Sequence, residues 1–455
     1  MSRPLDTIAA LATPSGTAAL ALLRISGPDT RRIATELGAT APLPRVARHL
    51  DYRRRDGTLL DDVLATYFQG PHSYTGEDSL EISCHGNPFI AQQILEDLFA
   101  HGCRPAEPGE FTQRAFLGGR MDLSQAEAVM DVIHARSERA LAAAQHQLRG
   151  GLARRMNDLV ESLLGVLARI EAYIDFPEED LPPEDRTLAG RELEKIARET
   201  DRLLATSHYG ELLRDGIKTV IVGAPNVGKS SLLNRLVGRE RALVSPEPGT
   251  TRDFLEERIV VGPHCLRIID TAGLNTSPAP LEKLGMEKTL ERMEEADLFL
   301  VVLDASRPEV TAPSELISRI RPQVTITVFN KIDLVESRAT PRTSTEAREG
   351  GAIVRVSAVS GEGLEELSAT IVRLADSLGT NLAEDMIAVS ARHAHALGEA
   401  REGLHAALAK LRGAEPVELL ASDLRSVLSA FGAIVGKVDN ERMLDQLFAS
   451  FCIGK

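Results

Sequence analysis

The stretch Gly-Ala-Pro-Asn-Val-Gly-Lys-Ser at residues 223–230 decides the fold of the middle of this chain. It has the spacing G-x-x-x-x-G-K-S of a phosphate-binding P-loop, follows an apolar run at 219–222 and precedes a helical pattern at 231–236. A buried strand that leads through a glycine loop into a helix directs backbone N–H groups toward an anion. We therefore expect Lys229 to reach the β- and γ-phosphates of a nucleotide, and Ser230 to bind Mg²⁺.

The base of that nucleotide is indicated by Asn330-Lys331-Ile332-Asp333, which follows a second apolar run. Guanine presents two N–H donors on one edge, and the Asp333 carboxylate can accept both, whereas adenine would leave it unmatched. Two more segments stand in the expected order after apolar runs: Asp270-Thr271-Ala272-Gly273, near Mg²⁺ and the γ-phosphate, and Ser357-Ala358, whose backbone N–H would face the guanine carbonyl. Together the four segments predict a Ras-like α/β P-loop GTPase domain.

The composition is that of a large folded protein with an acidic surface. The 455 residues suffice for about three domains. The net charge is −14, so a nucleic acid could be held only by a local basic patch or through a partner. One candidate patch is Arg45, Arg48, Arg53, Arg54 and Arg55, although a solvated strand face explains these arginines at least as well. The 4% aromatic content and the lack of Trp argue against extensive base stacking.

The cysteines and histidines do not form a metal-binding pattern. Cys84, Cys103, Cys265 and Cys452 are scattered without a C-x-x-C pair, which disfavours disulfides and zinc. His393, His395 and His405 fall in one helical segment, where we expect ordinary helix-surface histidines. The sequence also shows no signal peptide and no apolar run of about 18 residues. We expect a protein of the reducing cytoplasm.

Periodicity divides the chain into an α+β part, a helical part and the GTPase module. Short apolar runs alternate with turns in the first 118 residues, with a hairpin turn at Asp56-Gly57. Between residues 152 and 174 apolar residues recur every three or four positions, which predicts a long amphipathic helix, and this spacing returns at 397–431. Helical segments on both sides of an α/β unit predict an insertion. The expected domains are 1–119, 120–215, 216–378 and 379–455, with the second and fourth forming one helical domain.

Several short motifs outside the P-loop resemble a known family. They are Asp6-Thr7-Ile8, Leu23-Arg24-Ile25-Ser26-Gly27, Tyr74-Thr75-Gly76-Glu77-Asp78, Pro108-Gly109-Glu110-Phe111-Thr112, Arg114-Ala115-Phe116, Asp122-Leu123, Ile174-Asp175-Phe176-Pro177-Glu178-Glu179, Gly249-Thr250-Thr251-Arg252-Asp253 and Phe451-Cys452-Ile453-Gly454-Lys455. Over essentially its whole length the chain resembles the MnmE (TrmE) family of tRNA modification GTPases. The resemblance implies a multidomain fold: an α+β folate-binding-like N-terminal domain that dimerises, an all-α central domain, and an inserted α/β P-loop GTPase domain.

The same resemblance implies a reaction and partners. The family forms homodimers and joins the FAD-dependent protein MnmG (GidA) in a heterotetramer or larger complex. Together they add an aminomethyl or carboxymethylaminomethyl group to C5 of the wobble uridine, U34, of certain tRNAs. A 5-formyl- or methylene-tetrahydrofolate supplies the one-carbon unit.

Carried over by motif, the folate contacts are Arg24, Glu81, Arg120 and Lys455. Position 120 is often Lys in the family, and Arg keeps the charge. Without the resemblance, Arg24 would be interpreted as a strand-edge salt bridge and Lys455 as part of a frayed end. Cys452 could serve as a reactive thiol in the one-carbon step, although a small buried apolar residue is the simpler interpretation.

Hydrolysis requires a group that orients water, and Leu274, where many GTPases have Gln, cannot do so. The resemblance gives this role to Glu282, acting through water, although the sequence alone favours a solvated glutamate at a helix start. The resemblance also implies that K⁺, bound between paired GTPase domains, takes the place of an arginine finger. The K⁺ ligands would be Asn226, Ser245, Glu247 and Thr250, and Thr251 would join Ser230 on Mg²⁺.

The complete set of expected GTP contacts is Asn226, Val227, Gly228, Lys229, Ser230, Ser231, Ser245, Thr250, Thr251, Asp270, Thr271, Ala272, Gly273, Asn330, Lys331, Asp333, Ser357 and Ala358. The chain departs from the family at Asn275, where Arg is common, which puts a switch-region ion pair from that position in doubt. The nucleotide site itself is unaffected by this departure.

Two other functions are compatible with parts of the sequence. A regulatory Era-like GTPase of ribosome assembly would share the P-loop and N-K-x-D logic, but would typically have an RNA-binding domain after the GTPase domain. A purely folate-dependent aminomethyltransferase would not need the intact GTPase domain. The N-terminal motifs and the Cys-Ile-Gly-Lys end favour the tRNA-modifying GTPase.

Overall fold

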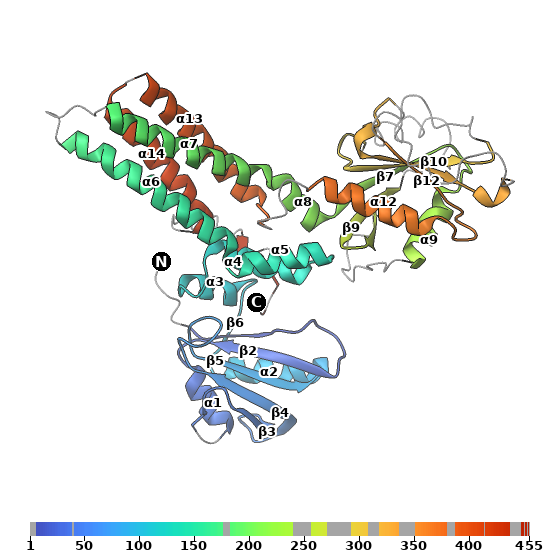
Figure 1. Cartoon of the computed structure of the whole chain (residues 1–455). Helices are drawn as coiled ribbons and strands as arrows, with labels where there is room; N and C mark the ends of the chain where they lie inside the picture. The colour runs from blue at the N-terminus through green and yellow to red at the C-terminus, as the bar shows by residue number, and fades with distance from the viewer. Residues whose placement is uncertain are drawn as a thin grey trace, which may run out of the picture. The chain divides into compact units, whose positions relative to one another are not determined.

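The structure is a computed structural model of the chain, and it describes residues 6–38, 41–175, 183–239, 256–270, 293–307, 318–335, 351–379, 387–413, 415–436, 447–449, 451–452 and 454 (Figure 1). The chain divides into two compact units. Unit 1 comprises Met1–Met130, Leu152–Val160 and Phe431–Lys455, and unit 2 comprises Asp131–Gly151 and Glu161–Ala430.

Unit 1 contains a six-stranded sheet in the order β3-β4-β5-β2-β1-β6. The strands are β1 (Ile8–Leu11), β2 (Leu20–Ser26), β3 (Ala47–Arg53), β4 (Leu59–Phe68), β5 (Ser79–His85) and β6 (Arg104–Pro105). Neighbouring strands are antiparallel, except that β6 pairs parallel to β1. The predicted hairpin turn is confirmed, because β3 and β4 pair on either side of Gly57, which has φ 84°.

The core of unit 1 forms where two helices pack on this sheet. Helices α1 (Thr30–Gly38) and α2 (Pro88–Ala100) contribute Ile33, Ile94 and Leu98, which pack with Leu23 and Ile82 of the strands. Helix α3 (Glu110–Leu117) follows β6. Alternation of inward and outward residues along β2 and β5 leaves polar side chains on the other face of the sheet.

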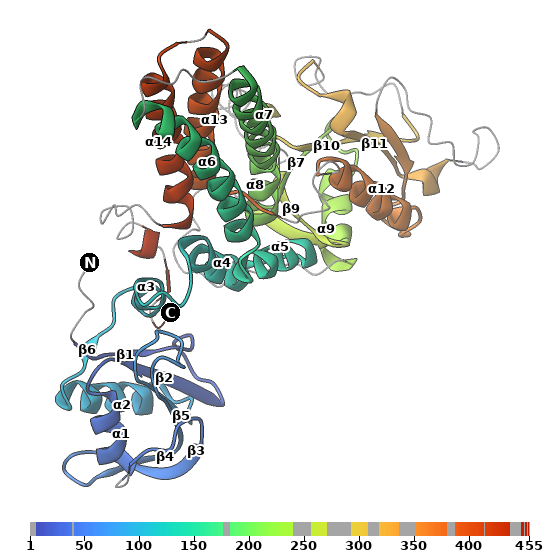
Figure 2. The same ribbon diagram turned by 60° about the vertical axis from the view of Figure 1, so that its left-hand side comes forward.

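The helical part contains α4 (Leu123–His134), α5 (Glu138–Leu148), α6 (Gly151–Asp175), α7 (Pro183–Ala205), α8 (Ser207–Asp215), α13 (Ala391–Arg412) and α14 (Val417–Val435). The long helix expected from residue 152 is confirmed as α6. Within unit 2, α7 and α13 lie side by side, as Figures 1 and 2 show, and the ion pair Arg412–Glu194 joins them at 2.8 Å. Among the helices that the structure describes, none could cross a membrane.

The expectation of helix-surface histidines is wrong for His393. Its side chain is fully buried at the start of α13, where its backbone N–H donates to Ser390 Oγ and its Nδ1 accepts from the Ser390 N–H. His393 therefore closes a capping box at the helix N-terminus, a position usually held by Glu or Gln. His395 is exposed as expected.

The GTPase part of unit 2 is a six-stranded sheet in the order β12-β11-β10-β7-β9-β8. The strands are β7 (Ile217–Val222), β8 (Glu256–Val261), β9 (His264–Asp270), β10 (Leu298–Asp304), β11 (Thr325–Asn330) and β12 (Ala352–Arg355), and the sheet is parallel except at β8. Helices α9 (Lys229–Arg239) and α12 (Leu364–Ser377) and two 3₁₀ turns, η2 (Pro322–Val324) and η3 (Ile332–Leu334), complete the described elements. The carboxyl ends of β7, β10, β11 and β12 lie at one edge, where open α/β sheets bind their ligands.

Two segments that flank the GTPase sheet in the sequence lie in contact. Helix α8 precedes β7, and residues 387–390 precede α13. A Cβ atom at Gly210 of α8 would lie 2.5 Å from the carbonyl oxygen of Val389, so the two connections touch and only glycine fits between them. This arrangement is that of a domain inserted into the helical part.

Candidate functional sites

The P-loop lies between β7 and α9, as its sequence predicts. Two of its glycines are required by close approach: a Cβ at Gly223 would lie 2.4 Å from the Val302 carbonyl oxygen, and one at Gly228 would lie 2.3 Å from Asn330 Nδ2. Lys229 folds over the loop and donates from Nζ to the carbonyl oxygens of Gly223 (2.8 Å) and Ala224 (2.9 Å). The loop therefore places a buried ammonium group at the N-terminus of a helix, which suits a polyanionic ligand.

Asn330 joins three of the predicted segments. Its side chain is buried, its Nδ2 donates to the Val227 carbonyl oxygen at 3.0 Å, and its Oδ1 accepts from the Ala358 N–H at 3.0 Å. These bonds connect the P-loop, the end of β11 and the loop after β12. The structure thus brings together residues that lie more than a hundred positions apart in the sequence.

Lys331 makes a second bridge to the P-loop, through a residue that the sequence analysis missed. Its Nζ donates to the Asn226 carbonyl oxygen at 2.6 Å and to Asp304 Oδ2 at 2.7 Å. Asp304 ends β10 and also accepts from the Ser306 N–H and hydroxyl. The bond from Lys331, with help from Ser306, lowers the pKa of Asp304 to about 2. Asp304 lies opposite Asn330 in the β10–β11 register, and this alignment is the feature by which Asp304 could have been recognised as part of the site.

The remaining described residues of the predicted GTP site differ in exposure. Asp333 on η3, and Ser230 and Ser231 at the start of α9, are exposed and open to a ligand. Ser357 is buried, and its N–H donates to the Glu362 carbonyl oxygen at 2.9 Å. Because the N–H groups of Ser357 and Ala358 both have partners within the protein, a guanine carbonyl would have to share or replace one of these bonds.

Part of the predicted site lies outside the described residues. These positions are Ser245, Glu247, Thr250, Thr251, Thr271, Ala272, Gly273, Leu274, Asn275, Glu282 and Lys455. Asp270 ends β9, but its side chain is not described. Within the described ranges, no cluster of three or more His, Cys, Asp or Glu residues could hold a metal ion by itself. A cation at Ser230 would therefore draw its other ligands from phosphate, water or these further positions.

A second polar cluster lies on the sheet of unit 1. Arg24 on β2 and Glu81 on β5 are cross-strand partners, and Arg24 Nη2 is 2.8 Å from Glu81 Oε1. The Arg24 guanidinium also lies over the rings of Tyr74 (5.4 Å) and Phe111 (5.8 Å), and its Nη1 donates to the Gly454 carbonyl oxygen at 3.4 Å. Two predicted folate contacts and the C-terminal segment therefore meet at one place. Arg120 is exposed, and none of the described hydrogen bonds joins its side chain to Arg24 or Glu81.

The preferred interpretation of Cys452 as a small buried residue is wrong. Cys452 is exposed, because the adjacent Phe451 takes the buried place and packs with Phe448. Cys84, Cys103 and Cys265 are buried, and burial raises the pKa of the Cys84 thiol to about 11 and that of Cys103 to about 12. Among the four cysteines, only Cys452 is open to reagents.

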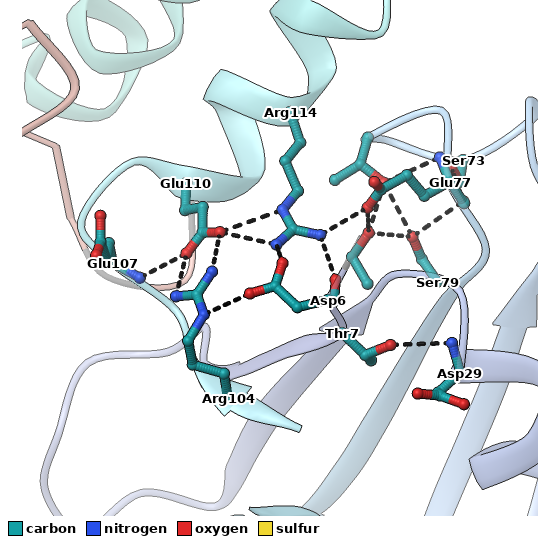
Figure 3. A network of polar contacts seen from close by, with 12 residues as sticks. Asp6, Thr7, Asp29, Ser73, Glu77, Ser79, Arg104, Glu107, Glu110 and Arg114 are labelled. Carbon is teal, nitrogen blue, oxygen red and sulfur yellow. Dashed lines mark hydrogen bonds and ion pairs between the residues drawn. The ribbon is translucent and has the colours of Figure 1, made fainter. Parts of the chain in front are cut away.

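A partly buried ionic network in unit 1 is centred on Arg114 (Figure 3). Arg114 of α3 is 1% exposed and contacts Glu110 Oε1 (2.8 Å), Asp6 Oδ1 (2.9 Å) and Glu77 Oε2 (3.2 Å). Arg104 of β6 contacts Glu110 and Asp6, each at 2.7 Å. The hydrogen bond from Arg104 is the largest cause that lowers the pKa of Asp6. All five residues belong to unit 1, and four of them, Asp6, Glu77, Glu110 and Arg114, lie in the short family motifs named above.

Comparison with known proteins gives a consistent match along the chain. The model of the family described as "MnmE helical domain" matches residues 123–452, and that described as "GTP-binding protein TrmE N-terminus" matches residues 7–120. The tRNA modification GTPase MnmE of Opitutus terrae is 62% identical over 450 residues, covering 99% of each chain. That of Akkermansia muciniphila is 44% identical over 464 residues, covering 100% of each chain.

Among solved structures, the G domain of the T. maritima FeoB iron transporter is 30% identical and covers 35% of this chain and 98% of that one, with a TM-score of 0.26. That score is too low to support an argument. The GTPase fold is supported here by the described sheet, the P-loop and the segments that converge on it.

Proposed function

The chain belongs to the MnmE family of tRNA modification GTPases, and from this premise we propose how its parts divide the work. The protein is a GTPase that acts in tRNA modification. We propose that it binds guanine nucleotides together with Mg²⁺. In our proposal, unit 2 binds and hydrolyses GTP, and unit 1 holds the one-carbon donor. The proposed domains are 1–119, 120–215, 216–378 and 379–455.

The nucleotide site is proposed to consist of all the GTP contacts named from the sequence. The observation that supports it best is the pair of bridges from Asn330 and Lys331 to the P-loop, which fix the base-binding segment beside the phosphate-binding segment. Asp333 follows directly on η3 and is exposed, so its carboxylate is available to guanine. Ser230 and Thr251 would bind Mg²⁺.

The assignment of Asp333 can be tested by exchanging the specificity of the site. Asp333→Asn replaces one acceptor oxygen by a donor that opposes a guanine N–H, so GTP affinity should fall by roughly tenfold or more while xanthosine triphosphate affinity rises. Titration with fluorescent nucleotide analogues measures both affinities, with Asp215→Asn, an exposed aspartate at the end of α8, as the control. Unchanged preference for GTP would contradict the role of Asp333.

Hydrolysis is proposed to depend on Glu282 and on K⁺. Glu282 would orient water because Leu274 cannot, and removal of one such positioning group typically lowers the rate by about 10²–10³-fold. Single-turnover hydrolysis by Glu282→Ala, with GTP affinity measured in parallel, separates this role from binding. A rate within about threefold of the wild type would assign Glu282 to the solvated surface. The K⁺ ligands are proposed to be Asn226, Ser245, Glu247 and Thr250.

The tRNA reaction is proposed to be the addition of an aminomethyl or carboxymethylaminomethyl group to C5 of U34. Arg24, Glu81, Arg120 and Lys455 would bind 5-formyl- or methylene-tetrahydrofolate, and the meeting of Arg24, Glu81 and Gly454 supports this. The protein would act as a homodimer with MnmG (GidA), in the cytoplasm, where tRNA is modified. The Era-like alternative is not favoured, because the residues after the GTPase domain match the MnmE helical domain.

Nucleoside mass spectrometry tests this reaction directly. A bacterial strain without its own copy of such an enzyme would be complemented with the wild type, Lys229→Ala or Arg24→Met. Restoration of modified U34 by the wild type, but by neither variant, is the expected result. Complementation by Lys229→Ala would show that the modification does not need the nucleotide site.

A further inference from the structure

The described residues of the C-terminal segment of unit 1, 447–449, 451–452 and 454, contact α4, the residue before α3, and β1. Phe448 and Phe451 are buried in a cluster with Leu123, Ala126 and Met130. At the edge of that cluster the Gly109 N–H donates to the Cys452 carbonyl oxygen at 3.3 Å, and Arg24 donates to the Gly454 carbonyl oxygen. The segment thus reaches from an apolar anchor to the Arg24–Glu81 pair.

Two glycines make this approach possible, one on each side of the contact. Gly109, the residue before α3, has φ 68°, and a Cβ there would lie 2.7 Å from the Phe448 carbonyl oxygen and 2.8 Å from Phe451 Cβ. Gly454 has φ 93°, and its Cβ would lie 2.5 Å from the Leu11 carbonyl oxygen. A side chain at either position would displace the segment, because backbone atoms on both sides leave no room.

The ionic network fixes the position of Gly109. The Glu110 carboxylate contacts Arg104 and Arg114 and also accepts from the Glu107 N–H at 2.9 Å, so the turn 107–110 is held from both sides of Gly109. Arg114 connects the same carboxylate to Asp6, which precedes β1, and to Glu77, which precedes β5 (Figure 3). A buried arginine among carboxylates keeps one geometry, since each lost partner leaves an unpaired buried charge.

We propose that Gly109 and the network Asp6–Glu77–Arg104–Glu110–Arg114 are the positioning residues of the C-terminal segment, and that only the seated segment completes the ligand site at Arg24. This inference rests on the folate site of the proposed function and goes beyond it. It assigns a common task to the network members of three motifs, at residues 6–8, 74–78 and 108–116. Within the described residues, each of these motifs contributes a member of the network.

The role of Gly109 in holding the C-terminal segment can be tested with Gly109→Ala, and Gly57→Ala serves as the matched control. Both glycines have positive φ, 68° and 84°, but a Cβ at Gly57 meets nothing within 4 Å, so the control has the backbone strain without the collision. A nitroxide label on Cys452 reports the mobility of the segment, since the other three cysteines are buried. We expect an immobilised spectrum for the wild type and Gly57→Ala, and a predominantly mobile one for Gly109→Ala.

The link to the ligand is measured on the unlabelled proteins. Calorimetry with 5-formyltetrahydrofolate should give at least a tenfold weaker affinity for Gly109→Ala, and a change below twofold for Gly57→Ala. GTP hydrolysis should be unchanged in both. If Gly109→Ala proves unstable, Phe451→Ala releases the segment from its own side, with Phe89→Ala, 71% exposed, as its control.

The outcomes separate the inference from the proposed function. An immobilised segment in both Gly109→Ala and Phe451→Ala would show that Gly109 and Phe451 do not hold the C-terminal segment in place. A mobile segment with unchanged folate affinity would show that folate binding does not depend on the position of the segment. Absence of folate binding by the wild type would overturn the folate site itself, and with it the coupling. Tenfold weaker binding that accompanies mobility in both variants is the result that supports the inference.

Discussion

At the end of β10, the Asp304 carboxylate positions a lysine that spans two loops. Lys331 has φ 65° and holds the Asn226 carbonyl oxygen with the same ammonium group that Asp304 binds. Asn226 also has positive φ, 63°, so the bridge stabilises two backbone conformations that L-residues rarely adopt. In the proposed site, Asp304 would therefore act on the nucleotide only through Lys331 and the P-loop.

Asp304→Asn should weaken guanine nucleotide binding without changing base preference. The lost ion pair is partly exposed, so a contribution of about 1 kcal/mol and an affinity loss of about three- to tenfold are expected. Because the pKa of Asp304 is lowered to about 2, its carboxylate is ionised throughout the neutral range, and its contribution should be lost only as the pH falls from about 4 through 2. Titration with a fluorescent GDP analogue at pH 5 and pH 8 checks both statements. Equal affinity of the variant and the wild type would contradict them.

At the residue scale, the sequence predicts functional side chains that belong to motifs. It misses side chains whose role depends on their neighbours in the folded structure. Lys229 and Asn330 belong to fixed patterns, whereas Asp304 is one aspartate after an apolar run until β10 and β11 are aligned. The exposure of Cys452 depends on which of two adjacent residues, Phe451 or Cys452, faces the apolar cluster. The spacing of apolar residues does not decide this in so short a segment.

At the scale of elements, α5, β9 and α12 meet at one carboxylate in unit 2. His264 at the start of β9 is buried, and its Nε2 is 2.8 Å from Asp376 Oδ1 of α12. The same oxygen lies 2.6 Å from Arg139 Nη2 of α5. Burial lowers the pKa of His264 although the bond to Asp376 opposes the shift. The imidazole is therefore neutral in the folded protein at pH values where it would be protonated in the unfolded chain.

His264 should make the GTPase domain less stable in mild acid. A lowered folded-state pKa gives stability that is complete above the unfolded value of about 6.5 and decreases as the pH falls below it. In calorimetry of the full chain, the transition that GDP shifts upward identifies the GTPase domain. Its Tm should fall more steeply from pH 7 to pH 5 in the wild type than in His264→Gln, whereas His405→Gln, an exposed control, should follow the wild type. Parallel curves for all three would refute the assignment.

The elements themselves were largely predictable, because their patterns are long or strongly periodic. Helix α6 follows from its repeated apolar positions, and β7, β9 and β11 from apolar runs before polar motifs. The contact between α5 and the GTPase domain could not be predicted, since its polar partners, Arg139, His264 and Asp376, are isolated in the sequence. The buried position of His393 could not be predicted for a similar reason, because a capping histidine has the same sequence context as a surface histidine.

At the scale of the whole molecule, the proposed activity depends on a second copy of the chain. In the proposal, K⁺ acts between paired GTPase domains. Among its proposed ligands, Asn226 is the one that belongs to the described residues. Asn226 is exposed on the P-loop, and Lys331 holds its backbone. A cation at this position would offset the charge that develops on the leaving phosphate.

GTP hydrolysis should therefore be faster in KCl than in NaCl, and Asn226→Ala should lose most of that difference. Asn234→Ala, which removes an exposed amide from α9, should keep it. Phosphate release at matched ionic strength measures the rates, and GTP affinity is measured in parallel to separate binding from turnover. Wild-type rates that do not distinguish the two salts would contradict a K⁺ site.

The contact between Gly210 and Val389 has a mechanical consequence. A domain joined to the rest of the protein by one chain segment can rotate about that segment. A domain joined by two segments in contact can bend but resists twisting. A rotation of the GTPase domain at this contact would therefore act on α8, which contains Gly210, and on α13, which begins two residues after Val389. A Cβ at Gly210 would lie 2.5 Å from the Val389 carbonyl oxygen, so the two chain segments are in direct contact at this point. We expect this contact to resist twisting of the GTPase domain at the connection, and lengthening of one of the two chain segments alone to remove that resistance.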